Sequence, residues 1–450
     1  MTRAGIVLAA GMGTRMKSAL PKVMHTIAGL PILGHVVKAM RGAGIDRIVV
    51  VTASDAESVR AFAASLGAES VVQEQQLGTG HAAACAREVL STFSGPLMVT
   101  YGDHPLFTAE TFEASFAARE KAGMALVAFR PHDPAAYGRV ILDSEGFVAR
   151  MVEFKDATTE ERKVDLCNAG VIAADAKSFF RWSAALKNDN VQKEYYLTGV
   201  PLLARAEGVC CAVVEADEPE MMGVNSRAEL AAAEAAMQVR LRARALDAGV
   251  GMIAPETVFL SHDTILEPDA QLGPYLFFGP GVTVRSGAEI RAFSHLEGAE
   301  IGHGALIGPF ARLRPGARIE DDVHIGNFVE VKNARIEKGA KANHLTYLGD
   351  ARVGAGANIG AGTITCNYDG FDKHFTDIGA GSFIGSNAAL VAPLKVADGT
   401  YVGAGSVITK ETAKDSLAVT RAEQKEIPGW AAKFRTRKKA EKAAKAAKGK

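Results

Sequence analysis

Cysteine is scarce in this sequence, and the few cysteines present are not spaced like a disulfide framework or a metal site. The chain has five cysteines among 450 residues, at positions 85, 167, 210, 211 and 366. Their number is odd and no Cys-x-x-Cys pair occurs, which argues against both a set of structural disulfides and a zinc site. We therefore expect reduced thiols in a cytosolic protein.

Long hydrophobic runs and an excess of either charge are also missing. The first apolar run, "IVLAA" at residues 6–10, is too short for the hydrophobic part of a signal peptide, and no stretch is long enough to cross a bilayer. The 51 basic residues balance 51 acidic ones, so the overall charge indicates no polyanionic partner. We expect a cytoplasmic protein that binds neither a membrane nor a nucleic acid.

The length of the chain predicts more than one domain. Up to about residue 225, β-rich apolar runs such as "DRIVVV" and "PLMVTYGD" alternate with helical stretches. This alternation indicates an α/β domain with a mostly parallel, Rossmann-like sheet over residues 1–225. Residues 226–248 are rich in Ala, Leu, Glu and Arg and are followed by Gly249, which predicts a connecting helix.

A six-residue repeat begins near residue 260. Aliphatic or aromatic residues recur at positions 260, 266, 272, 278, 284, 290 and 296, again from 301 to 331, and with interruptions from 348 to 408. An α-helix needs a 3.6-residue period, and the many glycines would also break it. The repeat therefore predicts a left-handed parallel β-helix over residues 249–432, in which each repeated apolar side chain points into a continuous core.

Two segments depart from the repeat. The period fails in "GAGTITCNYDGFDKHFTDI", residues 360–378, and an insertion in a solenoid is often a loop on the binding face. The last 18 residues carry nine Lys or Arg and one Glu. Such a run could contact a nucleic acid, but we favour a solvated, disordered tail over residues 433–450.

A glycine-containing loop follows the first apolar run. In "LAAGMGTRM", residues 8–16, Gly11 and Gly13 allow the backbone to turn tightly and approach a ligand, and Arg15 adds positive charge, so a phosphate fits. The loop lacks the third glycine of a dinucleotide-binding motif and the Gly-Lys-Ser/Thr end of a Walker A loop. Taken alone, it could equally be an ordinary turn.

Further motifs resolve this ambiguity. The loop, "LPKVMHTIAG" (20–29), "QLGTGHA" (76–82) and "YGDHPL" (101–106) together resemble the sugar-1-phosphate nucleotidylyltransferases. "AYGRV", "VEFKDAT", "NAG" and "GVNSR" are similar to the uridylyltransferase domain that makes UDP-N-acetylglucosamine. With "NHLTYLGD" and "CNYDG" in the hexapeptide region, nearly the whole chain resembles the family of bifunctional N-acetylglucosamine-1-phosphate uridylyltransferases/glucosamine-1-phosphate N-acetyltransferases.

The resemblance implies two reactions. The C-terminal domain would acetylate glucosamine-1-phosphate with acetyl-CoA, and the N-terminal domain would then transfer a uridylyl group from UTP to N-acetylglucosamine-1-phosphate, releasing pyrophosphate. It also implies Mg²⁺, a homotrimer and a supply of bacterial cell-wall precursors. An alternative keeps only nucleotidylyl transfer, with the β-helix as an oligomerisation module. A non-enzymatic scaffold would be expected to have lost Lys22, Asp103 or His344, and all three are intact.

Uridylyl transfer brings anionic phosphates together, so its site needs positive charge and a hard divalent cation. Arg15 and Lys22 can supply the charge. Asp103 ends a predicted strand, where open α/β sheets bind ligands, and its carboxylate suits Mg²⁺. The resemblance adds Asn225 as a second metal ligand. It also implies that the following residues, with Lys22 and Asn225, bind UTP and the sugar nucleotide: Leu8, Ala9, Ala10, Gly11, Gln73, Gly78 and Thr79 at the uridine, and Gly138, Glu153 and Asn168 at the sugar.

His104 is adjacent to Asp103 and could be a ligand. Because neighbouring side chains on a strand point to opposite faces, we expect a structural role for His104 instead.

Acetyl transfer to a sugar amine needs a base and groups that hold the sugar phosphate. His344 is the candidate base, because imidazole titrates near neutral pH and this histidine interrupts the repeat. The resemblance implies that Arg314 and Lys332 hold the phosphate, although most charges on a solenoid face are simply solvated. It further implies a sugar site at Tyr347 and Asn358, a contact from Lys373 to sugar or coenzyme, and acetyl-CoA contacts from Ala361, Asn367, Tyr368, Ser386, Ala404 and Arg421.

Overall fold

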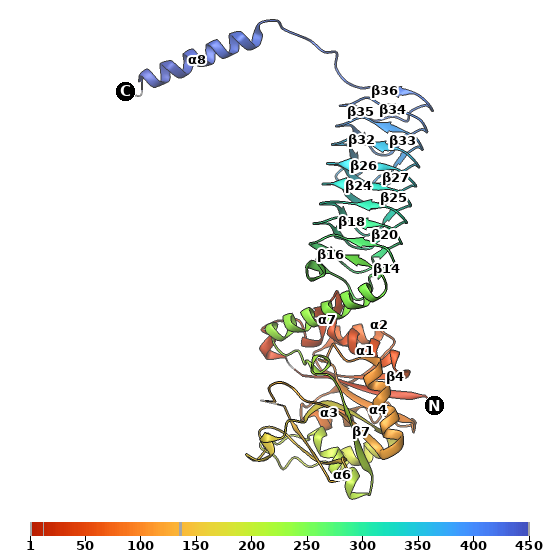
Figure 1. Ribbon diagram of the computed structural model, residues 1–450, viewed down its shortest axis with the longest axis vertical. Coiled ribbons are helices and arrows are strands. Elements are labelled where there is room, and N and C mark those ends of the chain that lie inside the picture. Colours follow the sequence, from red (N-terminus) through yellow and green to blue (C-terminus); the bar gives the residue numbers. More distant parts are fainter. Residues whose placement is uncertain (1, 12, 135–136, 449–450) are drawn as a thin grey trace. The chain divides into compact units, whose positions relative to one another are not determined.

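A computed structural model of the chain describes residues 2–11, 13–134 and 137–448. Met12 of the glycine loop, Ala136 of the "AYGRV" motif and the last two residues of the tail lie outside the described part. The chain forms two compact units (Figure 1). The first comprises Met1–Pro268 and Leu272–Val282, and the second comprises Asp269–Gln271 and Thr283–Lys450.

The first unit is built on a nine-stranded sheet. Its main path is β11-β7-β10-β6-β1-β4-β5, formed in that order by Cys210–Glu215, Gly123–Phe129, Cys167–Asp175, Pro96–Tyr101, Arg3–Ala9, Ile45–Ala53 and Glu69–Gln73. Beside this path, β8 (Arg139–Leu142) and β9 (Val148–Val152) form an antiparallel pair. β10 is antiparallel to both β6 and β7, whereas the pairs β1–β4, β1–β6, β4–β5 and β7–β11 are parallel. The sheet is therefore mostly parallel, as the sequence predicts.

Helices cover both faces of this sheet (Figure 1). One buried core contains side chains of α1 (Ile32–Gly42), α2 (Glu57–Ser65) and α4 (Ala109–Ala122), and the other contains side chains of α3 (Thr79–Cys85), α5 (Ala176–Ala184) and α6 (Val200–Ala206). Because β1, β4, β5 and β6 are parallel, the carboxyl ends of β1, β5 and β6 lie at the same edge of the sheet, where loops follow each strand.

The predicted connecting helix is α7 (Arg227–Asp247). Ser226 caps its N-terminus, with its Oγ accepting a hydrogen bond from Glu229 N at 3.2 Å. Gln238 of α7 bonds both backbone groups of Leu260, at 2.7 and 2.8 Å. Such contacts explain why the segment up to Val282 clusters with the first unit, although the change in sequence pattern suggests a boundary at residue 249.

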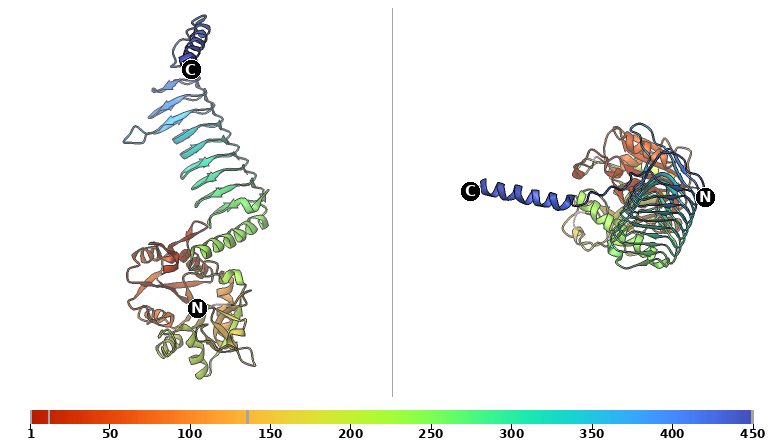
Figure 2. Two further views of the ribbon diagram at one scale, coloured as in Figure 1. Left: turned by 90° about the vertical axis from the view of Figure 1, so that its left-hand side faces the viewer. Right: turned by 90° about the horizontal axis from the view of Figure 1, so that it is seen from above.

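Short parallel strands stack as successive coils of a β-helix in the second unit (Figure 2). One face carries β21 (Leu306–Ile307), β24 (His324–Asn327), β26 (Lys341–His344), β28 (Asn358–Ile359), β31 (Phe383–Ile384) and β34 (Tyr401–Val402), each parallel to the next. The repeated apolar residues from Val284 to Ile408 are at most 3% exposed. The six-residue period therefore marks the core, whereas Leu266 in the first unit is only partly buried.

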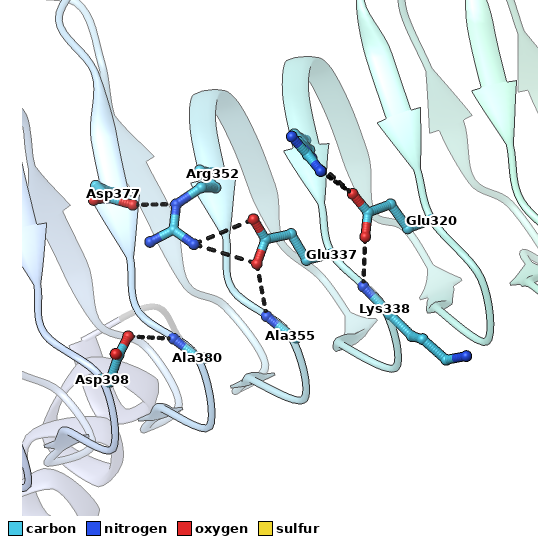
Figure 3. Close-up of polar contacts among 9 residues, drawn as sticks. Glu320, Glu337, Lys338, Arg352, Ala355, Asp377, Ala380 and Asp398 are labelled. Carbon is cyan, nitrogen blue, oxygen red and sulfur yellow. Dashed lines mark hydrogen bonds and ion pairs between the residues drawn. The ribbon is translucent and has the colours of Figure 1, made fainter.

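Carboxylates connect neighbouring coils along one edge of the β-helix (Figure 3). Three of them accept a backbone N–H of an adjacent coil at 2.8–3.1 Å: Glu320 from Lys338, Glu337 from Ala355, and Asp398 from Ala380. Arg352 adds ion pairs with Glu337 at 3.2 Å and Asp377 at 2.5 Å. These charges hold coils together rather than simply facing solvent.

The described part of the basic tail is helical, which corrects the expectation of a disordered segment. Helix α8 spans Trp430–Lys448, and its side chains up to residue 445 are exposed. Ala, Lys and Arg are strong helix formers, so a composition that cannot build a core can still form an exposed helix. No helix in the described part of the chain is both long and apolar enough to span a bilayer.

Candidate active sites

A cavity of about 430 Å³ opens at the carboxyl ends of β1, β5 and β6. The predicted uridine-site and metal-site residues that line it are Leu8, Ala9, Ala10, Gly11, Lys22, Gln73, Gly78, Thr79, Asp103 and Asn225. Val23, Gln76, Ala82, Tyr101, His104 and Glu194 complete the lining. Segments that are distant in sequence therefore meet at the edge where open α/β sheets bind ligands.

The glycine loop forms one wall of this cavity. Gly13 has a left-handed backbone with φ of 58°, and a Cβ at this position would lie 2.7 Å from Lys22 Cβ, so glycine is required. Gln76, which the sequence reasoning did not single out, donates from Nε2 to the Ala10 carbonyl at 2.8 Å. Arg15 lies in the short helix η1 (Thr14–Met16), is exposed, and is not part of the cavity lining.

The predicted uridine-side residues are fixed by backbone contacts. Gln73 Nε2 donates to the Gly78 carbonyl at 3.2 Å, and Thr79 Oγ1 accepts from Leu197 N at 3.0 Å. Gly78 has φ of 108°, and a Cβ there would lie 2.7 Å from the Tyr195 carbonyl oxygen. The backbone at the start of α3 therefore tolerates only glycine at this position.

Lys22, Asp103 and Asn225 form the polar centre of the cavity. Lys22 Nζ lies 2.5 Å from Asp103 Oδ2 and 2.9 Å from Asn225 Oδ1. The Asp103 carbonyl accepts from Val224 N at 2.9 Å, which brings Asn225 beside the turn after β6. Burial alone would raise the pKa of Asp103, but His104 and Lys22 outweigh it and hold that pKa well below its usual range.

Two oxygens that converge on one ammonium group are also suited to a metal cation. Carboxylate and amide oxygens are hard ligands, and Mg²⁺ is typically held by one or two carboxylates together with substrate phosphates. Asp103 and Asn225 fit this pattern, with the Lys22 ammonium standing where their oxygens converge. Among the described residues there is no group of three or more His, Cys, Asp or Glu side chains that could hold a metal ion.

The expectation that His104 points away from Asp103 is wrong. β6 ends at Tyr101, so residues 103 and 104 lie in a turn, where strand alternation does not apply. His104 Nδ1 lies 2.7 Å from Asp103 Oδ1. Because an ionised carboxylate can only accept, His104 donates this hydrogen bond.

The three residues predicted to bind the sugar are not part of the lining of this cavity. Asn168 N donates to the Gly138 carbonyl at 2.9 Å, and a Cβ on Gly138 would lie 3.4 Å from Glu153 Oε2. Burial raises the pKa of Glu153, which accepts a hydrogen bond from Thr198 Oγ1 at 3.3 Å. Tyr101 lines the cavity, and burial and then the charge of Glu153 raise the pKa of its phenol.

Three cations lie close together on the β-helix. Contact with Lys373, and then the charge of Arg314, lower the pKa of Lys332 in β25 (Glu330–Ile336). Arg314 also pairs with Glu330 at 2.8 Å. Lys373 comes from the segment that interrupts the repeat, so this loop folds against the coil that carries Lys332. Lys373 and Arg314 repel the charge of Lys332, the Asp350 carboxylate offsets part of this repulsion, and a bound phosphate would offset more of it.

His344 lies at the end of β26 and is exposed. Its Nδ1 is 2.8 Å from Asn327 Oδ1, and the two residues are register partners on adjacent coils. An amide oxygen only accepts, so Nδ1 donates this hydrogen bond, and in the neutral imidazole this leaves the lone pair on Nε2. The sequence did not predict this role of Asn327, because whether Asn327 lies beside His344 depends on the number of residues in the coil between them.

The interrupting loop runs between β29 (Ile364–Cys366) and β30 (Thr376–Ile378) and projects from the stack of coils (Figure 2). Asn367 Nδ2 donates to Asp350 Oδ2, which ties the loop to the coil below. Tyr368 donates from its hydroxyl to the Gly370 carbonyl at 2.6 Å and is 61% exposed. The loop therefore presents an ordered aromatic side chain to solvent.

The predicted coenzyme residues Ala361, Ser386 and Ala404 occupy equivalent positions on successive coils. Asn358 of β28, Phe383 of β31 and Tyr401 of β34 are register partners, and each predicted coenzyme residue follows one of them by three positions. Arg421 Nη1 donates to the Ala404 carbonyl at 3.0 Å. Tyr347 lies in β27 (Tyr347–Val353) and Asn358 in β28. A Cβ on Gly349 would lie 2.2 Å from the Tyr347 hydroxyl, so glycine makes room for this ring.

Comparison with known proteins identifies both halves of the chain. Residues 5–206 match the MobA-like NTP transferase domain, and residues 298–333 match the bacterial transferase hexapeptide (six repeats). Proteins named "Bifunctional protein GlmU" match almost end to end. That of Paramagnetospirillum magneticum is 53% identical over 443 residues, and that of Rhizorhabdus wittichii is 57% identical over 444 residues, each alignment covering 98% of both chains. The chain belongs to the GlmU family.

Membership of the GlmU family confirms the family predicted from the sequence. It also confirms the fold class, an NTP transferase domain followed by a hexapeptide β-helix. The chain is a bifunctional GlmU-type enzyme with uridylyl transfer in the first domain and acetyl transfer in the second, acting on nucleotide and acetyl-CoA substrates. The alternative of a nucleotidylyltransferase with a purely structural β-helix is therefore not adopted.

Proposed function

We propose that the chain makes UDP-N-acetylglucosamine in two steps at two separate sites. The acetyl group of acetyl-CoA is transferred to glucosamine-1-phosphate within residues 249–432, and the product receives the uridylyl group of UTP within residues 1–225. Residues 226–248 join the two domains, and the tail over 433–450 has no part in uridylyl transfer. The cavity around Lys22 and Asp103 and the distinct cation cluster around Lys332 carry this proposal.

At the first site, Asp103 and Asn225 would hold Mg²⁺ through their side-chain oxygens. A divalent cation held there would neutralise phosphate charge and make the α-phosphate more susceptible to attack by the sugar phosphate. Lys22 supplies a further positive charge to the phosphates. Arg15 of the glycine loop, which is not part of the cavity lining, also supplies positive charge to them. The uridine lies along residues 8–11, beside Gln73. The sugar lies toward Glu153, where Gly138 and Asn168 border it.

At the second site, His344 Nε2 takes the proton of the sugar ammonium. The free amine then attacks the thioester carbonyl of acetyl-CoA, the amide bond forms, and coenzyme A leaves as its thiol once protonated. The hydrogen bond from Nδ1 to Asn327 keeps the imidazole in the tautomer that this step needs. Lys332 and Arg314 hold the sugar phosphate.

The remaining predicted residues surround the acetyl group and its carrier. Tyr347 and Asn358 border the sugar, and Lys373 reaches it from the loop. The coenzyme lies along the aligned series at 361, 386 and 404, between the loop residues Asn367 and Tyr368 and the guanidinium of Arg421. Hexapeptide β-helices commonly associate, and we propose a homotrimer whose coenzyme sites lie at subunit boundaries. We place the enzyme in the bacterial cytosol, where its product feeds cell-wall synthesis.

The two half-reactions test these roles separately. The Asp103→Ala variant is expected to lose uridylyl transfer. Its rate of acetyl transfer is expected to equal that of the wild type. His344→Ala is expected to lose acetyl transfer by about 10²–10⁴-fold, as for removal of a general base, while uridylylating supplied N-acetylglucosamine-1-phosphate normally. If either substitution removes both activities in a folded protein, the assignment of two separate sites is wrong.

A further inference from the structure

We propose that His104 is a positioning residue for the metal ligand Asp103, holding one carboxylate oxygen so that the other serves the cation. This inference rests on the Mg²⁺ site proposed above. It assigns a task to a histidine that sequence reasoning set aside as structural.

The two oxygens of Asp103 have different partners. Oδ1 accepts from His104 Nδ1 at 2.7 Å, and Oδ2 accepts from Lys22 Nζ at 2.5 Å. Lys22 also contacts Asn225 Oδ1, the other proposed metal ligand. The side of the carboxylate that faces the cation site is therefore Oδ2. The Oδ1 side is occupied by a fixed donor from the same turn.

His104 is itself held by its surroundings. Its ring stacks on Phe107 with centroids 5.3 Å apart and planes inclined by 16°, and it lies 5.7 Å from the ring of Tyr101. The side chain of His104 is 12% exposed. A ring packed between two aromatic side chains has few rotamers available, so its Nδ1 points at Asp103 whether or not a cation is bound.

Gly223 makes room for this arrangement. A Cβ at this position would lie 3.0 Å from His104 Cε1 and 3.1 Å from His104 Nε2, which is closer than ordinary packing allows. Gly223 begins the motif "GVNSR", and the Val224 N–H bonds the Asp103 carbonyl. One short segment therefore supplies the ligand Asn225, fixes the Asp103 backbone and leaves space for the histidine.

Outer hydrogen bonds of this kind orient ligating groups, and their loss typically weakens metal binding by about 10–100-fold. Without His104, the Asp103 carboxylate would be free to rotate, and Oδ2 would no longer be held toward Asn225. Binding of the metal should suffer more than the folding of the domain.

The test measures Mn²⁺ binding to the full chain by the electron paramagnetic resonance signal of the free ion. Asp103→Ala defines the binding that belongs to this site. His104→Leu removes the donor but keeps an apolar side chain, and is expected to raise the Kd for Mn²⁺ by about 10–100-fold. His104→Asn restores an N–H donor and is expected to recover most of the affinity. Gly223→Ala is expected to weaken binding by displacing the ring.

The Mg²⁺ concentration needed for half-maximal uridylyl transfer should shift in the same order, while acetyl transfer by the same proteins stays unchanged. Wild-type affinity in His104→Leu, or equal losses in the Leu and Asn variants, would overturn the positioning role and leave the metal site standing. If Asp103→Ala binds Mn²⁺ as wild type does, the metal site itself is misassigned and the role of His104 falls with it.

Discussion

At the scale of residues, both sites depend on charges held close to other charges. In the first site, a buried carboxylate lies between a lysine and a histidine, so attraction keeps Asp103 ionised. In the second site, Lys332 lies against Lys373, so repulsion makes its charge costly until an anion arrives. Electrostatic interaction with neighbouring charged groups therefore favours a bound cation at the first site and a bound anion at the second.

The lysine pair gives a pH dependence of known sign. Phosphate binding needs Lys332 charged, and because contact with Lys373 lowers its pKa, affinity for glucosamine-1-phosphate is lost at a lower pH than an isolated lysine would allow. Lys373→Met removes the like charge and raises the Lys332 pKa toward its ordinary value. The alkaline loss of affinity should therefore move to higher pH, measured as KM against pH for acetyl transfer.

A matched control is Lys338→Met, which removes a lysine that is paired with Asp322 at 3.6 Å and is not among the groups that shift the pKa of Lys332. The substrate amine titrates alike in every variant, so a difference between the two profiles isolates Lys332. Profiles of Lys373→Met and wild type that coincide after scaling would show that the two lysines are not coupled in the working enzyme.

The residues that bear charge could be predicted, whereas their partners could not. Lys22, Asp103 and His344 stand in motifs whose spacing is visible in the sequence. The contact of His104 with Asp103 depends on the strand ending two residues earlier, at Tyr101. The contact of Asn327 with His344 depends on a coil of 17 residues at that point, rather than on the six-residue period. Both contacts depend on where a strand ends or how long a coil is, and the types of the residues in contact do not predict either.

At the scale of elements, periodicity was most informative where one side chain per repeat is buried. The apolar positions of the β-helix could be predicted because every coil repeats the same burial pattern. Strand β10 (Cys167–Asp175) was not predicted, although it carries Asn168 and lies at the centre of the sheet. Its run "CNAGVIAAD" is mostly small residues, and its antiparallel pairing depends on partners far away in the sequence.

For the tail, the prediction of disorder from amino-acid composition was wrong, because its residues up to Lys448 belong to helix α8. Helix α8 is exposed along its described side chains, so its removal should cost the two domains little. Deleting residues 436–450 is expected to leave the rate of uridylyl transfer unchanged, measured as pyrophosphate release from UTP and N-acetylglucosamine-1-phosphate. A large loss of that rate in a folded protein would show that the tail acts on the first domain.

At the scale of the whole molecule, two transferase domains occur in one chain, each with its own constellation of residues. The order of the domains and both reaction classes could be predicted from motifs, because each motif set lies within one domain. The central claim is that the two reactions occur at two separate sites, so that each can be lost without the other.

The most direct measurement mixes two purified variants, Asp103→Ala and His344→Ala, with glucosamine-1-phosphate, acetyl-CoA, UTP and Mg²⁺, and follows the products by mass spectrometry. Neither variant alone should form UDP-N-acetylglucosamine. The mixture should form it, with N-acetylglucosamine-1-phosphate appearing first, because one protein makes the intermediate and the other consumes it. A mixture that accumulates the intermediate without sugar nucleotide, or His344→Ala alone completing both steps, would contradict the account.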